Sequence, residues 1–200
     1  MNKTLRAVAI AALSVAALTP AMAQETPWQV RVRAVNLDPA NKTDTTAVKG
    51  LSVNEKLIPE LDISYFFTPN IAAELILTYP QKHNVKANGN VIGSLRHLPP
   101  TLTMQYHFMP NDTAIRPYVG AGLNYTNFSS VDLPPTYNVK RGSWGWALQA
   151  GMDIPLNKQW SLNVDVKKVQ IHADVTVAGD KVGTLKVDPL LIGVGLGYRF

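Results

Sequence analysis

Residues 58–79 of the sequence read IPELDISYFFTPNIAAELILTY. On either side of Thr68-Pro69-Asn70, one set of alternate positions is wholly uncharged, and the other set holds Glu60, Asp62 and Glu74. Alternation with a period of two is typical of β-strands, and proline and asparagine suit a tight turn. The stretch therefore predicts a β-hairpin whose two faces differ in polarity.

The same pattern extends along the chain in both directions from this hairpin. It predicts eight strands of about eight to eleven residues, at 28–35, 58–67, 72–79, 100–108, 116–125, 146–154, 160–167 and 190–200. A tilted strand needs roughly 9 to 11 residues to cross a hydrocarbon core. The expected strands are therefore close to the length of membrane-spanning strands.

The connections between these strands alternate in length. Three are tight turns at 68–70, 110–112 and 155–158, and four are long and polar, near 38–56, 80–98, 127–143 and 172–188. Short turns at one end and long loops at the other are the arrangement of outer-membrane barrels. The chain therefore reads as consecutive hairpins of one domain, residues 24–200, and not as two domains.

The first 23 residues differ from the rest. Lys3 and Arg6 precede an apolar stretch at 7–18, and Ala21-Met22-Ala23 follows it, which is the pattern of a secretory signal peptide at 1–23. The chain has no cysteine, so disulfides and thiolate ligands are excluded. Its formal net charge of +5 is weak and scattered, so it gives no reason to expect a nucleic-acid partner.

The two faces of the expected strands differ in charge. The face that includes Leu61, Leu75, Val119 and Leu196 has no charged residue. The opposite face carries Arg31, Arg33, Glu60, Asp62, Glu74, His107, Arg116, Asp153, Asp165, Lys167 and Arg199. Taken alone, this division fits a water-soluble sandwich as well as a membrane barrel.

The aromatic residues of the uncharged face favour the barrel. Those at strand ends next to the termini and tight turns are Trp28, Tyr65, Phe67, Tyr106, Phe108, Trp160, Tyr198 and Phe200. Tyr79, Tyr125 and Trp146 stand at the ends next to the long loops. Two aromatic bands mark the two interfaces of a membrane. The sequence therefore predicts an all-β, eight-stranded antiparallel transmembrane barrel in the outer membrane, with both termini in the periplasm.

The inward charges predict how the lumen is filled. Five cations, at 31, 33, 116, 167 and 199, face five carboxylates, at 60, 62, 74, 153 and 165. The interior of an eight-stranded barrel is only just filled by side chains. Equal numbers of opposite charges in that space favour a paired network that closes the lumen.

Four runs of the sequence resemble a known family. They are 59–71, with Tyr65-Phe66-Phe67-Thr68-Pro69-Asn70 at its centre, 97–102, 116–125 and the terminal Gly197-Tyr198-Arg199-Phe200. Together they look like the OmpW family of small outer-membrane proteins. The resemblance covers almost the whole exported chain. It implies a monomeric barrel with a narrow, largely apolar lumen that passes small hydrophobic molecules, and a C-terminal signal at Tyr198 and Phe200 read by the barrel assembly machinery.

The resemblance also implies a constriction. In family members that have one, an aliphatic residue of the third strand and an aromatic residue of the seventh close the lumen. The matching residues here are Ile76 and Lys167, so a cation stands where the aromatic ring is expected. We expect Ile58 and Phe66 to line the lumen beside Ile76.

Other function classes find less support in the residues. A surface or structural protein with a closed, salt-bridged lumen is the main alternative, with the loops as receptor or adhesion surface. An enzyme acting on lipid A would need a pair such as Ser129 or Ser130 with His83 or His97, and no spacing supports it. A metal held by His83, His97, His172 and Asp174 or Asp180 also lacks a ligand motif, so no metal or other cofactor is expected.

The loops suggest one further partner besides membrane lipid. Loop cations at 42, 49, 82, 86, 96, 140 and 141 could meet the phosphates of lipopolysaccharide or remain solvated. Both interpretations are compatible with the sequence.

Overall fold

The computed structural model describes residues 26–40, 42–44, 52–53, 55–87, 90–132, 137–177 and 180–200. The predicted signal peptide at 1–23 lies outside these residues. In the described part of the chain, no helix is long and apolar enough to cross a bilayer.

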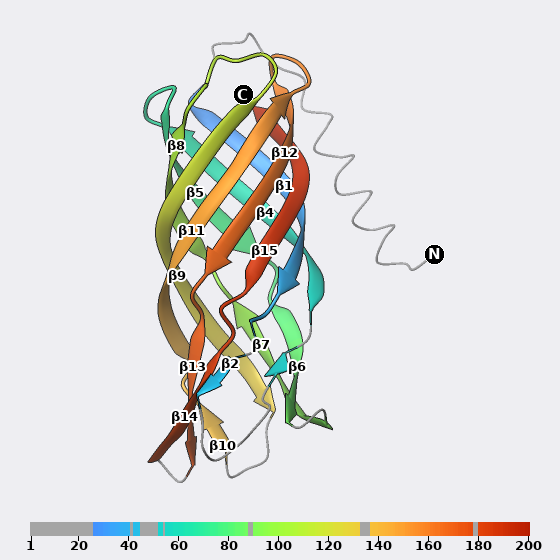
Figure 1. Cartoon of the computed structure of the whole chain (residues 1–200), viewed down its shortest axis with the longest axis vertical. Coiled ribbons are helices and arrows are strands. Elements are labelled where there is room, and N and C mark those ends of the chain that lie inside the picture. Colours follow the sequence, from blue (N-terminus) through green and yellow to red (C-terminus); the bar gives the residue numbers. More distant parts are fainter. Residues whose placement is uncertain are drawn as a thin grey trace, which may run out of the picture.

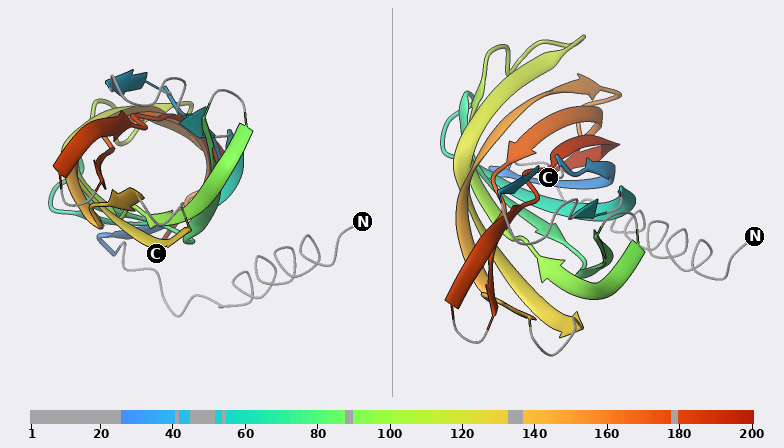
Figure 2. Two further views of the ribbon diagram at one scale, coloured as in Figure 1. Left: turned by 90° about the horizontal axis from the view of Figure 1, so that it is seen from below. Right: turned by 60° about the horizontal axis from the view of Figure 1, so that its bottom comes forward.

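Eight strands form a closed antiparallel ring (Figures 1 and 2). They are β1 (Trp28–Asp38), β4 (Lys56–Phe66), β5 (Ile71–Thr78), β8 (Thr101–His107), β9 (Arg116–Asp132), β11 (Gly142–Pro155), β12 (Trp160–Val169) and β15 (Leu190–Arg199). Each pairs with its neighbours in this order, and β15 pairs with β1, with Val32 opposite Leu196. The predicted eight-stranded barrel is confirmed, and its strands extend up to seven residues beyond the predicted ends.

Short polar side chains build the three tight turns. Thr68 Oγ1 accepts the amide of Ile71 at 3.0 Å, and Asn157 Oδ1 accepts the amide of Trp160 at 2.8 Å. Asp112 Oδ1 accepts the amides of Ala114 and Ile115, and these bonds hold the pKa of the Asp112 carboxyl below its ordinary value. Such side chains replace backbone turn hydrogen bonds, which is why these residue types mark the turns in the sequence. We call this end of the barrel the turn end.

The opposite, loop end contains strands where the sequence predicted only loops. They are β2 (Lys42–Asp44), β3 (Ser52–Val53), β6 (Gln81–Ala87), β7 (Asn90–Leu98), β10 (Tyr137–Val139), β13 (His172–Val177) and β14 (Asp180–Lys186). β6 pairs with β7 and β13 with β14, and these ribbons extend past the ring in Figure 1. The prediction of long polar loops was wrong here. Polar residues dominate β2 and β6 and hide any alternation, and β13, whose six residues do alternate, is shorter than the predicted membrane-spanning strands.

The exposure of the side chains agrees with a barrel that faces lipid. On the outer face, Leu75 is 38% exposed, Val119 44% and Leu196 47%, whereas Arg31 and Glu74 are 0% exposed inside the ring. A sandwich in water would show the reverse. Lipid contact with the apolar face also fixes the strand register, because a shift of one residue would turn charges toward hydrocarbon.

Aromatic side chains gather at both ends of the outer face. At the turn end, Trp28 meets Tyr65 and Trp160 meets Tyr198, each pair with ring centroids 4.9 Å apart. At the loop end, Tyr125 contacts Trp144, which was not assigned to this band from the sequence. These positions fit the two interfaces of a bilayer.

Glycines allow close approach of two pairs of neighbouring strands. A Cβ atom on Gly122 would lie 1.9 Å from the carbonyl oxygen of Leu102, and one on Gly195 would lie 2.0 Å from that of Val32. Neither position has room for a side chain. Glycine here is required by strand packing in the curved wall.

Candidate functional site in the lumen

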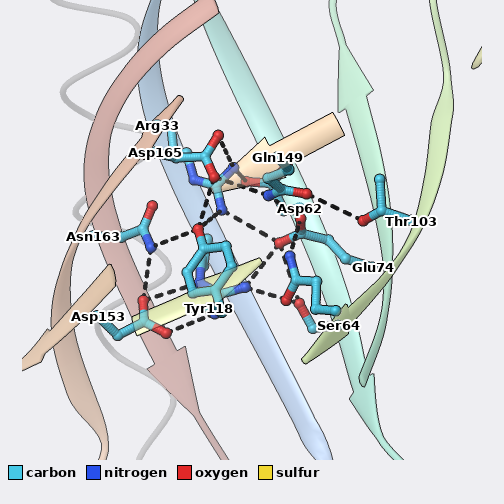
Figure 3. A network of polar contacts seen from close by, with 12 residues as sticks. Arg33, Asp62, Ser64, Glu74, Thr103, Tyr118, Gln149, Asp153, Asn163 and Asp165 are labelled. Carbon is cyan, nitrogen blue, oxygen red and sulfur yellow. Dashed lines mark hydrogen bonds and ion pairs between the residues drawn. The ribbon is translucent and has the colours of Figure 1, made fainter. Parts of the chain in front are cut away.

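The lumen contains a continuous set of buried ion pairs. Their members come from β1, β4, β5, β11 and β12, and they stand at inward positions of these strands. Figure 3 shows the central part of this set, which we call the lumen network. Each strand is hydrogen-bonded to a neighbour on both sides. This pairing fixes the position of every inward side chain along the barrel axis, which we call its height.

Arg31 is the most extensively bonded cation. Its Nη1 donates to Glu74 Oε1 at 2.8 Å and to Ser64 Oγ at 3.0 Å. Its Nε and Nη2 donate to the two carboxylate oxygens of Asp153, at 3.2 and 2.7 Å. This is the two-point geometry in which a guanidinium binds a carboxylate most strongly. Arg31 thereby joins β5 to β11 across the lumen.

Arg33 continues the network toward the loop end. Its Nη1 lies 3.1 Å from Glu60 Oε1 and 3.3 Å from Asp62 Oδ2, and its Nη2 lies 3.3 Å from Glu74 Oε1. The same Nη2 donates to the hydroxyl of Tyr118. Arg31 and Arg33 therefore share one oxygen of Glu74.

Lys167 forms the loop-side boundary of the network. Its Nζ contacts Glu60 Oε1 at 2.5 Å and Asp165 Oδ1 at 3.0 Å. Its side chain is 2% exposed. The cation that stands in place of an aromatic ring is therefore held by two carboxylates.

Neutral side chains complete the hydrogen bonding. Tyr118 donates to Asp165 Oδ2 at 2.8 Å and accepts from Asn163. Gln149 Nε2 donates to Glu74 Oε2 at 2.8 Å and to Asp165 Oδ2 at 2.9 Å, and Gln105 Nε2 also donates to Glu74 Oε2. Burial of charges is tolerated only with such a complement of donors.

The network differs in composition from the sequence prediction. In the described ion pairs, three cations, Arg31, Arg33 and Lys167, face five carboxylates, Glu60, Asp62, Glu74, Asp153 and Asp165. Arg116 lies at the turn end instead, where its Nε donates to the carbonyl oxygen of Asp112. The guanidinium of Arg199 lies 4.1 Å above the ring of Phe66, also at the turn end. The described ion pairs therefore include three of the five predicted cations and all five predicted carboxylates.

Buried apolar side chains stand on the loop side of the network. Val35 and Leu37 of β1 continue the inward face of Arg31 and Arg33, and Ile58 pairs opposite Val35. Leu191 pairs opposite Leu37. With Val169 of β12, these residues form what we call the apolar wall: Val35, Leu37, Ile58, Val169 and Leu191. The wall lies on four neighbouring strands.

The residues predicted to line a constriction lie at different heights. Ile58 belongs to the apolar wall, and Phe66 lies at the turn end. Ile76 is buried and stands opposite Asp62 of β4 and Thr101 of β8, at the level of the ion pairs. Gln105, Gln149 and Tyr118 were not predicted, because the prediction for the lumen rested on charged residues. Their alternation with outward apolar residues marks them as inward in the sequence.

Comparison with known proteins identifies the family of this barrel. The profile of the OmpW family matches residues 24–200. The chain belongs to the OmpW family. A relative in Sinorhizobium fredii, the uncharacterized outer-membrane protein y4mB, is 45% identical over 189 residues, which cover 87% of this chain and 80% of that protein. Membership of the OmpW family places the barrel in the outer membrane.

Two further proteins similar to this OmpW-family chain come from Pseudomonas aeruginosa. The dibenzothiophene metabolism operon protein PahQ is 28% identical over 196 residues, which cover 91% of this chain and 92% of that protein. The crystal structure of the outer membrane protein OprG superposes with a TM-score of 0.74 and 27% identity, covering 86% of this chain and 95% of that chain. The fold therefore agrees with a solved barrel over most of its length.

The predicted assembly signal of this OmpW-family chain lies on the outer face of the last strand. Tyr198 contacts Trp160 at 4.9 Å and Phe200 at 5.0 Å between ring centroids. Recognition of Tyr198 and Phe200 by the barrel assembly machinery stays a prediction. The side chains of Ser129, Ser130, His83 and His97, weighed above for an enzyme, lie outside the described residues, as do those of Asp174 and Asp180, weighed for a metal site.

Proposed function

We propose that this protein takes up small apolar molecules from the loop end, binds them against the apolar wall and releases them sideways between strands into the bilayer. The observation that carries the proposal is the order of the two layers in the lumen. On β12, β15, β1 and β4, apolar side chains come first from the loop end, and the lumen network lies behind them. The facing strands β8, β9 and β11 contribute buried polar side chains at that end, among them Thr101, Asn124 and Ser143. The free energy falls when an apolar molecule moves from water to the apolar wall. It would rise if the molecule separated the buried ion pairs.

The seam between β4 and β5 is the proposed exit. In the described residues, the pairing of these strands ends at Glu60 opposite Thr78, while β4 continues to Lys56 along β1. Pro59 and Pro80 stand at this point and have no amide hydrogen to donate. An apolar molecule beside Ile58 would therefore meet the seam where its hydrogen bonding stops.

The name of one relative supports the class of molecule. PahQ is named for an operon of dibenzothiophene metabolism, and dibenzothiophene is a small, uncharged aromatic compound. We therefore propose uncharged molecules of about this size as the substrates, and dibenzothiophene as the probe for uptake.

A disulfide across the seam tests the exit. Continuing the pairing of Glu60 with Thr78 by one residue brings position 59 opposite position 79. We expect the double variant Pro59→Cys/Tyr79→Cys, when oxidised, to lower dibenzothiophene uptake by intact cells about tenfold, and reduction to restore it. The chain has no other cysteine to interfere.

The matched control places a disulfide in the paired part of the same seam. Ile63 stands opposite Leu75, so Ile63→Cys/Leu75→Cys joins the same two strands where they are already hydrogen-bonded. Uptake by this variant should equal that of the wild type in both redox states. If the two disulfides change uptake equally, the exit between β4 and β5 is wrong.

Substitutions in the lumen separate sideways release from passage along the axis. Lys167→Ala opens space within the network, so it should raise uptake if molecules pass through the lumen and leave it unchanged if they leave by the seam. Ile76→Trp narrows the same level and should lower uptake only for axial passage. Planar-bilayer conductance of both variants measures the opening of the lumen directly.

The surface-protein alternative makes a different prediction. A barrel whose only role lies in its loops would leave dibenzothiophene uptake equal in a deletion strain and a complemented strain. That result would contradict the transport proposal.

A further inference from the structure

The turn end of the barrel contains a small cavity that the proposed uptake path does not use and that touches the lumen network only at Asp153. Its volume is about 20 Å³. The strand ends contribute Gln29, Phe66, Arg116, Ser161 and Arg199 to its lining, and the turn between β11 and β12 contributes Lys158. A space of this volume holds one or two water-sized groups.

The charges around this cavity are predominantly positive. Arg116, Lys158 and Arg199 line it, and Asp153 is the carboxylate among its lining residues. Both oxygens of Asp153 accept hydrogen bonds from Arg31, and Asn163 donates to Oδ1 as well. The negative charge of Asp153 is therefore directed into the lumen network, and three cations face the cavity.

Hydrogen-bond donors are available to a bound group. Ser161 is 6% exposed, and its hydroxyl has no hydrogen-bond partner among the described residues. Arg116, a lining residue, uses its Nε to bind the carbonyl oxygen of Asp112, which restrains the position of this side chain. The stacking of Arg199 on Phe66 holds a second guanidinium beside the same space.

From these observations we infer that the cavity binds an oxyanion group, the carboxylate or phosphate of a small anion. Ser161 and the guanidinium of Arg116 would donate to its oxygens, and Lys158 and Arg199 would supply positive charge. The small volume would admit one or two oxygens of such a group, and the remainder of the ligand would lie outside the cavity. The site is separate from the apolar wall, so either proposal can fail while the other stands.

Titration of the refolded barrel with inorganic phosphate and with acetate tests this site. We expect saturable changes in the NMR amide signals of Ser161 and its neighbour Trp160 at constant ionic strength maintained with sodium chloride. Ser161→Ala should weaken binding about fivefold, and Arg116→Gln and Lys158→Gln about tenfold each. Tight binding of phosphate alone identifies phosphate as the ligand class, and tight binding of acetate alone identifies carboxylates.

Loop-end variants provide the matched control. Lys140→Gln and Arg141→Gln remove exposed cations from the other end of the barrel and should leave the affinities unchanged. Equal weakening by the turn-end and loop-end variants, or equal signal changes with chloride alone, would overturn the proposal. Resistance of the folded band to SDS in gels verifies that each variant still forms the barrel.

Discussion

Arg31 and Asp153 are 122 residues apart in the sequence and form a two-point ion pair across the lumen, with Nη2 2.7 Å from Oδ2 and Nε 3.2 Å from Oδ1. We expect Arg31→Met to lower the free energy of unfolding by about 3 to 5 kcal/mol, because Asp153 and Glu74 would keep their charges in a buried space without this cation. Urea unfolding of the barrel in lipid vesicles measures the loss.

The control for this prediction removes an exposed cation. Arg141 lies just before β11 at the loop end. We expect Arg141→Met to change the free energy of unfolding by less than about 0.5 kcal/mol. If the two variants lose the same stability, the ion pair does not hold the barrel together as argued.

Two carboxylates of the lumen network should respond differently when they are neutralised. Glu74 accepts hydrogen bonds from Arg31, Arg33 and Ser64 on one oxygen and from two glutamines on the other. Asp62 accepts none among the described residues, although Arg33 Nη1 lies 3.3 Å away. Its negative charge is buried with little compensation.

We therefore expect Asp62→Asn to change the free energy of unfolding by no more than about 1 kcal/mol, while Glu74→Gln lowers it by about 3 kcal/mol. Both substitutions keep the side-chain volume, so packing is matched. Chemical unfolding of the two variants in the same vesicles gives the comparison. A larger loss for Asp62→Asn would show that its pairing with Arg33 outweighs the surplus of carboxylates.

The architecture could be predicted from the sequence because a charged side chain on the lipid-facing side of a strand costs free energy. A charge on the face that holds Leu61 and Leu75 would meet hydrocarbon, so the alternation divides each strand into one face without charges and one face that carries them. The aromatic residues then fix the two interfaces, and they separate a membrane barrel from a sandwich in water.

The site could be predicted only in part, since alternation gives the side of a residue and not its height or partner. Arg31 and Arg116 share the inward pattern, yet Arg31 meets Asp153 and Arg116 meets the turn at Asp112. The ribbon of β6 and β7 escaped prediction because polar residues occupy both of its faces. These details depend on contacts between strands that are far apart in the sequence. No local pattern of residues shows which strands will meet.

Glycines at close strand contacts should tolerate no side chain. A Cβ on Gly195 would lie 2.0 Å from the carbonyl oxygen of Val32, whereas one on Gly193 would have its nearest neighbour, a methyl group of Val35, at 3.1 Å. Gly195→Ala should lower the free energy of unfolding by about 3 kcal/mol, and Gly193→Ala by less than about 1 kcal/mol. Urea unfolding of both variants in lipid vesicles measures the two losses, and equal losses would contradict the close approach.

Hydrocarbon contact at the outer face makes the cost of a charge depend on its height. Leu75 stands in the middle of β5, and Leu57, 68% exposed, stands at the loop end of β4. We expect Leu75→Arg to lower the free energy of unfolding in vesicles by about 2 to 4 kcal/mol and Leu57→Arg by less than about 1 kcal/mol. The difference arises because an arginine near the interface reaches water and lipid phosphates, and one at the centre cannot do so without thinning the bilayer. In detergent micelles, which deform easily around a charge, the gap between the two variants should shrink. An equal cost at both positions in vesicles would mean that Leu75 does not face the hydrocarbon core.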